Sequence, residues 1–273
     1  MAAASTIISS RSNQSVKQLR AAFSENRRLS EGLVAIEGEH LVEEALKSGI
    51  RLTTVFLTPK RPLPSGLSQN TQVIRLSDDV FASAVETRTP QGIAALVAPP
   101  LYVLDDLFRR SSPLILMAAG IQDPGNLGTL IRSAEAFGAS GVITTPGTVS
   151  EWNQKALRAS VGSVFRLPVV TAQKEQLADL SRQGIHVFAA TGQQDLTVLP
   201  ASKADLTGPT VIMIGNEGSG LSETWLQLAT SGITIPCPGP VESLNAAVAG
   251  SLLLYEASRQ RVEAQLRRPT GAK

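Results

Sequence analysis

The sequence predicts an α/β protein in which a larger C-terminal α/β domain, built on a mainly parallel sheet, follows a small N-terminal αβα domain. Strands and helices alternate regularly from residue 113 onward, which is typical of a parallel sheet. Nearly every position of these strands is apolar, as expected where helices cover both faces. The chain has 273 residues, and Pro99 and Pro100 interrupt it where the pattern changes. We therefore expect an N-terminal domain at 1–100, a linker at 101–112 and a C-terminal domain at 113–273.

The N-terminal domain shows short helical and strand patterns in turn. Helical spacing of apolar residues predicts helices, β-branched runs predict strands, and glycine and proline mark the turns between them. In order, we expect a helix at 16–23, a strand at 33–38, a helix at 40–49, strands at 52–58 and 71–77, and a last strand from residue 92 that runs into Pro99. Together these elements form a small αβα sandwich.

The C-terminal domain has longer and more regular repeats of the same two patterns. We expect strands at 114–120, 141–145, 167–170, 186–190, 211–215 and 233–236. Helices are expected at 126–137, 150–163 and 176–184, after residue 215, and over the last thirty residues. In open parallel sheets, ligands bind outside the carboxyl ends of the strands. The loops at those ends are therefore the candidate functional segments.

The composition is that of a folded protein, with 42% hydrophobic and 18% charged residues. The single cysteine, Cys237, excludes an internal disulfide, so a cytoplasmic location is expected. The best apolar run, 113–121, has the length of a strand, so no membrane partner is expected. A formal charge of +2 leaves nucleic-acid binding open, because the clustered cations of the first thirty residues and of the C-terminal helix equally suit solvated helix faces.

The first candidate loop, at 121–138, follows the first strand of the C-terminal domain. Asp123 begins a turn with the proline and glycine that follow it, and Asn126 is a suitable cap for the next helix. Arg132 lies about two turns into that helix. Taken alone, this loop is explained by a turn, a helix cap and one exposed arginine.

The second loop, at 211–223, opens a buried strand toward a helix. Gly215, Gly220 and Ser222 match the spacing of a phosphate-binding loop. Leu221, however, stands where such a loop needs a lysine to meet the phosphates. The sequence therefore disfavours a nucleotide hydrolase.

The third loop leads into the C-terminal helix and spans 233–261. Its prolines rigidify the chain, and Ser243 and Asn245 provide hydrogen-bonding groups at the start of the helix. The run of small residues that follows permits close helix packing. A purely structural explanation accounts for each of the three loops singly but explains their combination poorly.

The three loops, in this order, resemble the three successive motifs of the SpoU/TrmH RNA 2'-O-ribose methyltransferases of the SPOUT superfamily. The segment EGEHLVEEAL at 37–46 similarly resembles the small substrate-binding domain of many members. The resemblance implies a deep trefoil knot in the C-terminal domain and a homodimer packed through this domain. It also implies S-adenosyl-L-methionine as methyl donor and RNA as substrate.

The resemblance further implies a role for particular residues. Arg132 activates the ribose hydroxyl, Asn126 positions it or the RNA, Glu217 organises the loop, and Ser243 and Asn245 contact substrate and cofactor. The implied cofactor pocket contains Thr191, Gly192, Ile214, Gly215, Asn216, Gly218, Ile235, Pro236, Ser243 and Leu244. A free arginine is a poor base because it already holds its proton at neutral pH, so an RNA phosphate held by Arg132 is the alternative proton acceptor.

The histidines and tryptophans of the chain are interpreted as structural residues. His40 and His186 have no Cys, Asp or Glu at ligand spacing, so no metal is expected. Trp152 and Trp225 lie on expected helices, where packing is commoner than stacking on bases.

The expected function is 2'-O-methylation of 23S-type ribosomal RNA, with guanosine favoured as the base and transfer RNA less favoured. The alternative is a non-catalytic RNA-binding protein with the same fold. The joint presence of the five catalytic candidates favours the enzyme.

Overall fold

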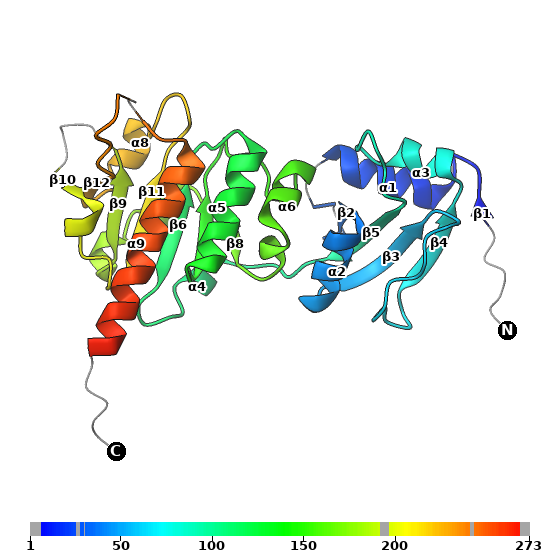
Figure 1. Ribbon diagram of the computed structural model, residues 1–273, viewed down its shortest axis with the longest axis horizontal. Coiled ribbons are helices and arrows are strands. Elements are labelled where there is room, and N and C mark those ends of the chain that lie inside the picture. The colour runs from blue at the N-terminus through cyan, green and yellow to red at the C-terminus, as the bar shows by residue number, and fades with distance from the viewer. Residues whose placement is uncertain (1–6, 26–27, 30, 192–196, 241–242, 268–273) are drawn as a thin grey trace, which may run out of the picture. The chain divides into compact units, whose positions relative to one another are not determined.

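The computed structural model describes residues 7–25, 28–29, 31–191, 197–240 and 243–267 (Figure 1). Close contacts divide the chain into two units. The first unit comprises Met1–Leu101 and Ser150–Arg166, and the second comprises Tyr102–Val149 and Leu167–Lys273. The segment 150–166 therefore makes most of its contacts within the first unit, although it lies in the sequence between two strands of the second.

A mixed five-stranded sheet forms the centre of the first unit (Figure 1). Its order is β1 (Ile7–Ile8), β4 (Gln72–Leu76), β3 (Arg51–Leu57), β5 (Ile93–Ala98) and β2 (Val34–Glu37). The strand β5 runs antiparallel to β2 and β3, whereas the β3–β4 and β1–β4 pairs are parallel. The helices α1 (Gln14–Glu25) and α3 (Asp78–Ala84) lie together on one face, and α2 (Glu39–Lys47) packs on β2, β3 and β5.

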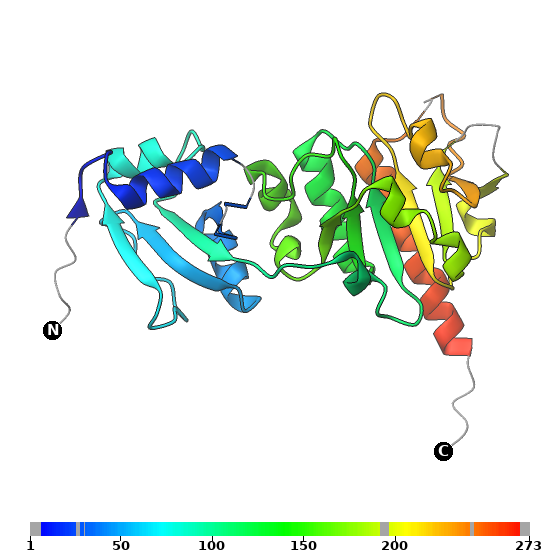
Figure 2. The same ribbon diagram turned by 180° about the vertical axis from the view of Figure 1, so that it is seen from behind.

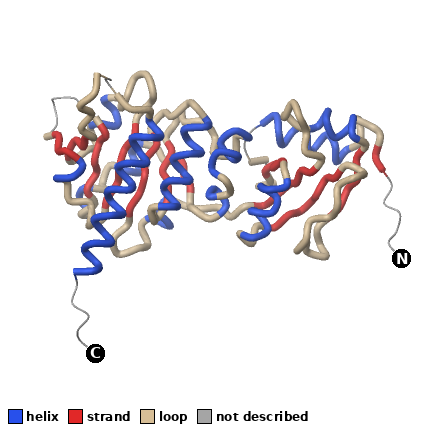
Figure 3. Tube along the Cα trace, in the orientation of Figure 1, coloured by secondary structure: helices blue, strands red, loops and turns tan. Residues whose placement is uncertain are grey.

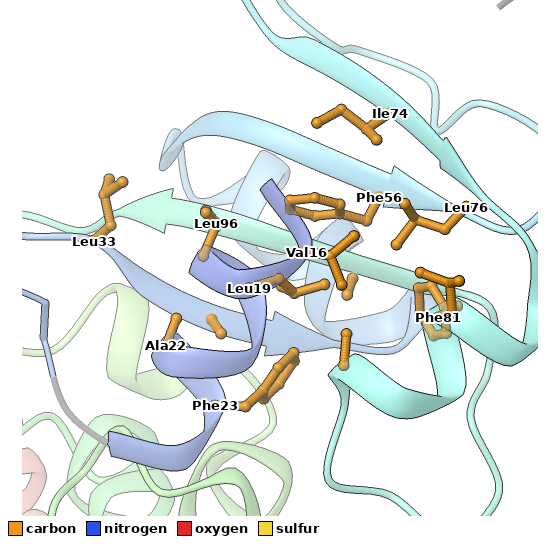
Figure 4. Close-up of a cluster of buried hydrophobic side chains, with 14 residues drawn as sticks. Val16, Leu19, Ala22, Phe23, Leu33, Phe56, Ile74, Leu76, Phe81 and Leu96 are labelled. Atoms are coloured by element: carbon orange, nitrogen blue, oxygen red, sulfur yellow. The ribbon is translucent and has the colours of Figure 1, made fainter. Parts of the chain in front are cut away.

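The core of the first unit shows why α1 forms where apolar spacing predicts it. Val16, Leu19 and Phe23 recur at helical spacing, point to the sheet and are fully or almost fully buried (Figure 4). They meet Phe56 and Leu96, which alternate along their strands with residues that face away from this cluster. The expected αβα sandwich is confirmed, whereas the two-residue strand β1 and the seven-residue helix α3 were too short to be predicted.

The helix α6 (Gln154–Ser160) belongs to the first unit and is shorter than the expected helix at 150–163. Asn153 caps its start by accepting a hydrogen bond from the Lys155 amide at 2.9 Å. Val161 and Gly162 end it because both adopt a positive φ, of 51° and 81°. The helix is tied to the sheet by Gln154, whose side-chain Nε2 donates to a β2 carbonyl at 2.9 Å.

The second unit is built on a seven-stranded sheet in which every neighbouring pair is parallel (Figure 2). Its order is β10 (Val198–Pro200), β12 (Ser231–Thr234), β9 (His186–Ala190), β11 (Thr210–Ile214), β6 (Leu114–Ala118), β7 (Gly141–Thr144) and β8 (Val169–Thr171). All residues of β6, β7 and β11 are buried. The expected α/β fold with a mainly parallel sheet is thus confirmed.

Helices cover both faces of this sheet, so that red strands lie between blue helices in Figure 3. The long helices α5 (Pro124–Ala136) and α9 (Ala246–Arg267) pack together on one face. The short helices α4 (Leu104–Leu107), α7 (Lys174–Leu177) and α8 (Glu223–Leu226) contribute to the apolar cluster on the other. Because the central strands are covered twice, they are apolar at successive positions rather than at alternate ones.

A glycine sets the close approach of α9 to α5 and the sheet. A Cβ added to Gly250 would lie 2.4 Å from Leu130 Cδ2 and 3.3 Å from Ile214 Cγ1. The next residue of α9 also faces α5, because the hydroxyls of Ser133 and Ser251 are 2.6 Å apart and share a hydrogen bond. The small residues of α9 therefore serve packing within the unit.

Two expectations for the second unit need correction, and one strand was missed. The helix expected at 176–184 is a four-residue helix followed by a separate 3-10 turn at Ser181–Gln183. The strand expected at 233–236 lies at Ser231–Thr234, and β10 was not predicted.

Within the part of the chain that the structure describes, no helix has the length and apolar character needed to cross a membrane. The trefoil knot stays a prediction.

Candidate functional site

Polar side chains from three distant segments meet at the carboxyl edge of the second unit's sheet. Asn126, in the first turn of α5, donates through Nδ2 to Oε1 of Glu217 at 2.8 Å. Its Oδ1 accepts a hydrogen bond of 3.1 Å from Nδ2 of Asn245. The Asn126 amide thus joins the loop after β11 to the start of α9. Three of the five expected catalytic residues are together.

Capping explains how Asn126 is freed for this role. The expected cap was Asn126 itself, but the helix begins at Pro124 and its cap is Asp123, whose Oδ1 accepts from the Asn126 backbone amide at 2.9 Å. This expectation was wrong because Pro124 occupies the first helical position, where proline loses no hydrogen bond. The Asn126 side chain is therefore left to point at its partners.

Asn245 has two functions in the same place. Its Oδ1 accepts hydrogen bonds from the backbone amides of Ala247 at 2.9 Å and Val248 at 3.2 Å, which caps α9. Its Nδ2 remains for Asn126. The two ends of one amide thus fix the helix start and the polar cluster together.

Hydrogen bonding keeps the Glu217 carboxylate charged. Partial burial raises its pKa, but hydrogen bonds from the Asn126 side chain and from the backbone amides of Glu217, Gln122 and Asp123 outweigh this effect. The pKa of Glu217 therefore lies below its ordinary value. Glu217 is ionised at neutral pH and acts as an acceptor in the cluster.

The loop after β11 is held by its own backbone. Asn216 and Gly220 exchange two backbone hydrogen bonds of 3.0 Å, and the Asn216 side chain donates to the carbonyl of Gly120 at 2.9 Å. A Cβ on Gly215 would lie 2.3 Å from the Gly220 carbonyl carbon. The missing side chain of Gly215 thus admits the neighbouring backbone. Leu221 is 7% exposed and packs in the core, which explains the apolar residue at this position.

A cavity of about 410 Å³ opens beside this cluster, at the ends of β9 and β12. Five of the expected cofactor residues line it: Thr191, Ile235, Pro236, Ser243 and Leu244. Gly192 lies outside the described residues. Four others, namely Ile214, Gly215, Asn216 and Gly218, lie at the end of β11 and do not line this cavity. Sequence reasoning missed the residues that enclose it from the strands and α9, which are Ala190, Ile233, Thr234, Ala249 and Leu253; the loop residue Cys237 also lines it.

Arg132 lies on α5, six residues beyond Asn126, or about 9 Å along the helix axis. Its side chain is exposed and makes no hydrogen bond or ion pair with any described residue. By contrast, Arg259 pairs with Glu256 at 2.8 Å, and Arg261 donates to backbone carbonyls, including that of Ser112 at 2.7 Å. These cations of the C-terminal helix are engaged within the protein, whereas Arg132 is available to an anion.

A second cavity, of about 280 Å³, was not anticipated from the sequence. It opens at the ends of β6, β7 and β11 and is lined by residues including Gln122, Pro146, Asn216 and Trp225. Trp225 also packs against the apolar cluster under the short helices, as expected of a packing residue. Across the described residues, no three His, Cys, Asp or Glu side chains gather in a way that would hold a metal ion.

Comparison with known proteins gives the family. Residues 113–255 match the model of the SpoU rRNA methylase family, which covers more than half of the chain. The chain belongs to the SpoU family. Residues 13–95 match a second model, the MRM3-like substrate-binding domain. Both parts of the resemblance inferred from the three loops and from the segment 37–46 are therefore confirmed.

Relatives of this SpoU protein match most of its length. The 23S rRNA (guanosine(2553)-2'-O)-methyltransferase RlmP of Bacillus subtilis is 35% identical over 91% of this chain and 97% of its own. The 23S rRNA (uridine(2479)-2'-O)-methyltransferase of Streptomyces viridochromogenes is 30% identical over 87% of this chain and 86% of its own. The crystal structure of the SpoU methyltransferase AviRb from Streptomyces viridochromogenes with AdoMet superposes with a TM-score of 0.80, at 29% identity, covering 92% of this chain and 98% of that one.

Proposed function

We propose that this SpoU protein transfers a methyl group from S-adenosyl-L-methionine to a ribose 2'-hydroxyl of 23S-type ribosomal RNA, with guanosine favoured as the base. The observation that carries the proposal is the joining of Asn126, Glu217 and Asn245 beside the 410 Å³ cavity. The names of RlmP, a 23S rRNA guanosine 2'-O-methyltransferase, and of AviRb, solved with AdoMet, support the substrate and the donor.

The residues around the 410 Å³ cavity fit the methyl donor. Ile235, Leu244 and Leu253 provide apolar walls for an adenine ring, while Thr191 and Ser243 provide hydroxyl groups. The volume falls within the range of small-molecule sites, roughly 300–1,000 Å³. When bound, the donor supplies an electrophilic sulfonium methyl group. The apolar walls would exclude water from that group, which protects it from hydrolysis.

The polar cluster and Arg132 would prepare the attacking hydroxyl. Methyl transfer is an in-line displacement: the ribose oxygen would bond to the methyl carbon as the carbon–sulfur bond breaks and the thioether leaves, and the hydroxyl would lose its proton. Asn245 and Asn126 present a fixed row of amide groups that would orient the ribose, with Glu217 holding the row in place. Arg132 would hold an RNA phosphate, which accepts the proton.

We also propose that the protein acts as a homodimer through α9. Val248, Leu252, Tyr255, Val262 and Leu266 follow one another at three- and four-residue or seven-residue spacing on this helix, and each is at least 43% exposed. An apolar stripe of this kind is typical of a helix that packs against a partner. Tyr255 is anchored by an edge-on contact with Phe137, with ring centroids 5.7 Å apart.

The cytoplasmic location expected from the sequence stays a prediction.

Two measurements test the proposal. Calorimetric titration with S-adenosyl-L-methionine should give micromolar binding, and the protein should transfer labelled methyl to an unmodified 23S rRNA transcript. Arg132→Ala should bind the donor normally and lose at least about 100-fold in kcat, the scale of an essential positioning or proton-transfer group. RNA binding without donor binding would instead support the non-catalytic alternative.

A further inference from the structure

The 280 Å³ cavity and the 410 Å³ cavity both border the polar cluster. In the order β12-β9-β11-β6-β7, the larger cavity lies at the ends of β9 and β12, and the smaller at the ends of β11, β6 and β7. Glu217 directly follows Asn216, which lines the smaller cavity, whereas Asn126 bonds to Asn245, which directly follows a residue that lines the larger one. A ribose held at this cluster would therefore lie beside both the methyl donor and the smaller cavity.

Building on the proposed function, we propose that the 280 Å³ cavity receives the base of the nucleotide that is methylated. None of the described residues that line it is charged, so it suits a neutral ring better than a phosphate. Its volume is just below the range of sites for whole small molecules, roughly 300–1,000 Å³, as expected for a single base. The half-buried indole of Trp225 and the ring of Pro146 give it apolar walls on which a flat ring packs.

One wall of the cavity is rigid. The Gly120 backbone amide is held in place, because it donates hydrogen bonds to the hydroxyls of Thr145 at 3.1 Å and Thr148 at 3.0 Å. The Gly120 carbonyl accepts from the Asn216 side chain, whose own Oδ1 accepts the backbone amides of Gly218 and Ser219. The polar groups of this wall are thus satisfied within the protein and do not need a ligand.

Two other lining side chains have unused hydrogen-bonding groups. Gln122 and Ser222 are exposed, and their side chains make no hydrogen bond to any described residue. The backbone of Gln122 is fixed beside Glu217, whose carboxylate it helps to hold. The Gln122 amide has one donor group and one acceptor, which is what the edge of a base requires. We assign Gln122 as the residue that reads the base and Trp225 as the surface on which the base stacks.

A base can enter this cavity only when it leaves its neighbours in the RNA. Unpaired nucleotides in loops pay the least energy for this movement, so the cavity favours a loop or bulge as target. Capture of the base would also hold the ribose at Asn126 and Asn245. Binding of the base would therefore also align the ribose, because both belong to the same nucleotide.

Kinetics with the full-length protein test the inference, on the shortest 23S rRNA fragment that the wild-type protein methylates. Trp225→Ala should lower kcat/KM about 10- to 100-fold, the scale of losing one base stack. Trp225→Phe should recover most of the loss, because phenylalanine keeps a ring. Gln122→Ala should lower kcat/KM about 10-fold, while the matched control Gln183→Ala, an exposed residue outside the cavity, should have no effect.

An abasic nucleotide at the methylated position separates base recognition from all other effects. With this fragment, the Trp225→Ala and Gln122→Ala proteins should be no worse than wild type. A direct signal comes from Trp152→Phe, which leaves Trp225 as the only tryptophan of the chain. Its fluorescence should be quenched by the intact fragment and not by the abasic one.

Wild-type kcat/KM in both Trp225→Ala and Gln122→Ala, with no quenching, would overturn the base site while leaving the methyltransferase function intact. Equal losses on intact and abasic fragments would also overturn it, because the residues would then act on something other than the base. Failure of the wild-type protein to bind the donor or methylate any 23S fragment is a distinct result, and overturns the proposed function itself.

Discussion

Asn126 donates to Glu217 across 91 residues of sequence, at 2.8 Å, and this hydrogen bond joins the start of α5 to the loop after β11. The donor and acceptor are fixed by chemistry, because a carboxylate accepts only and the amide nitrogen donates only. The orientation of the Asn126 amide is therefore set by Glu217. Its remaining oxygen is left for Asn245.

The first prediction concerns variants that exchange the donor and the acceptor of the Asn126–Glu217 hydrogen bond. Asn126→Asp places a carboxylate against Glu217, so the stability should fall by about 1–3 kcal/mol and kcat by at least about 10-fold. Glu217→Gln on top of it restores a donor and an acceptor in the opposite order. The double variant should recover most of the stability, measured by thermal melting. Additive losses in the double variant would show that the two residues do not interact.

The charge of Glu217 predicts a pH dependence. Its pKa in the folded protein lies below the ordinary value of 4.5, so the ionised form stabilises the fold above pH 4.5, and this contribution is lost as the pH falls through the lowered pKa. The difference in Tm between wild type and Glu217→Gln should therefore be constant near neutral pH and shrink in the acidic range. A difference that grew on acidification would contradict the direction of the shift.

Asn245 allows capping and catalysis to be separated. Asn245→Ala removes the cap of α9 and should cost about 1 kcal/mol, besides lowering activity. Asn245→Asp keeps an oxygen for the cap but lacks the donor for Asn126. It should melt above Asn245→Ala and still have reduced kcat. An active Asn245→Asp protein would show that only the cap matters.

Close packing at Gly250 predicts sensitivity to one methyl group. Gly250→Ala places a Cβ 2.4 Å from Leu130 Cδ2 in the core, so the helices must separate, at a cost of about 1–3 kcal/mol. Gly208→Ala is the matched control, because a Cβ there meets nothing within 4 Å and its φ is not positive. Thermal melting should show a lower Tm for Gly250→Ala and a Tm near wild type for Gly208→Ala. Equal Tm values for the two variants would contradict the prediction.

The exposed stripe of α9 predicts an effect on assembly. Leu252, which is 43% exposed, lies near the middle of the stripe, and Leu252→Glu should convert a dimer to a monomer by placing a charge in an apolar interface. Sedimentation measures the mass directly. The matched control is Arg182→Glu, at an 84% exposed side chain in the turn between α7 and β9. A wild-type protein that sediments as a monomer would contradict the dimer.

The sequence by itself determined the class of fold and the family. The strands β6, β7 and β11 are apolar at nearly every position because helices cover both faces, and this pattern is visible without coordinates. The three loops carry residue types whose order resembles the family's motifs, and this resemblance made Asn126, Glu217 and Asn245 candidates. The small αβα domain followed from the same local patterns.

Only the tertiary structure decided which candidates meet, because hydrogen bonds between segments 91 and 119 residues apart depend on strand order. It showed that Asp123 caps α5, that Gly215 makes room for Gly220, and that α6 ends at Val161. It also revealed the cavity at Gln122 and Trp225. Neither residue belongs to a recognisable pattern, and their shared surface arises only where the ends of β6, β7 and β11 lie side by side.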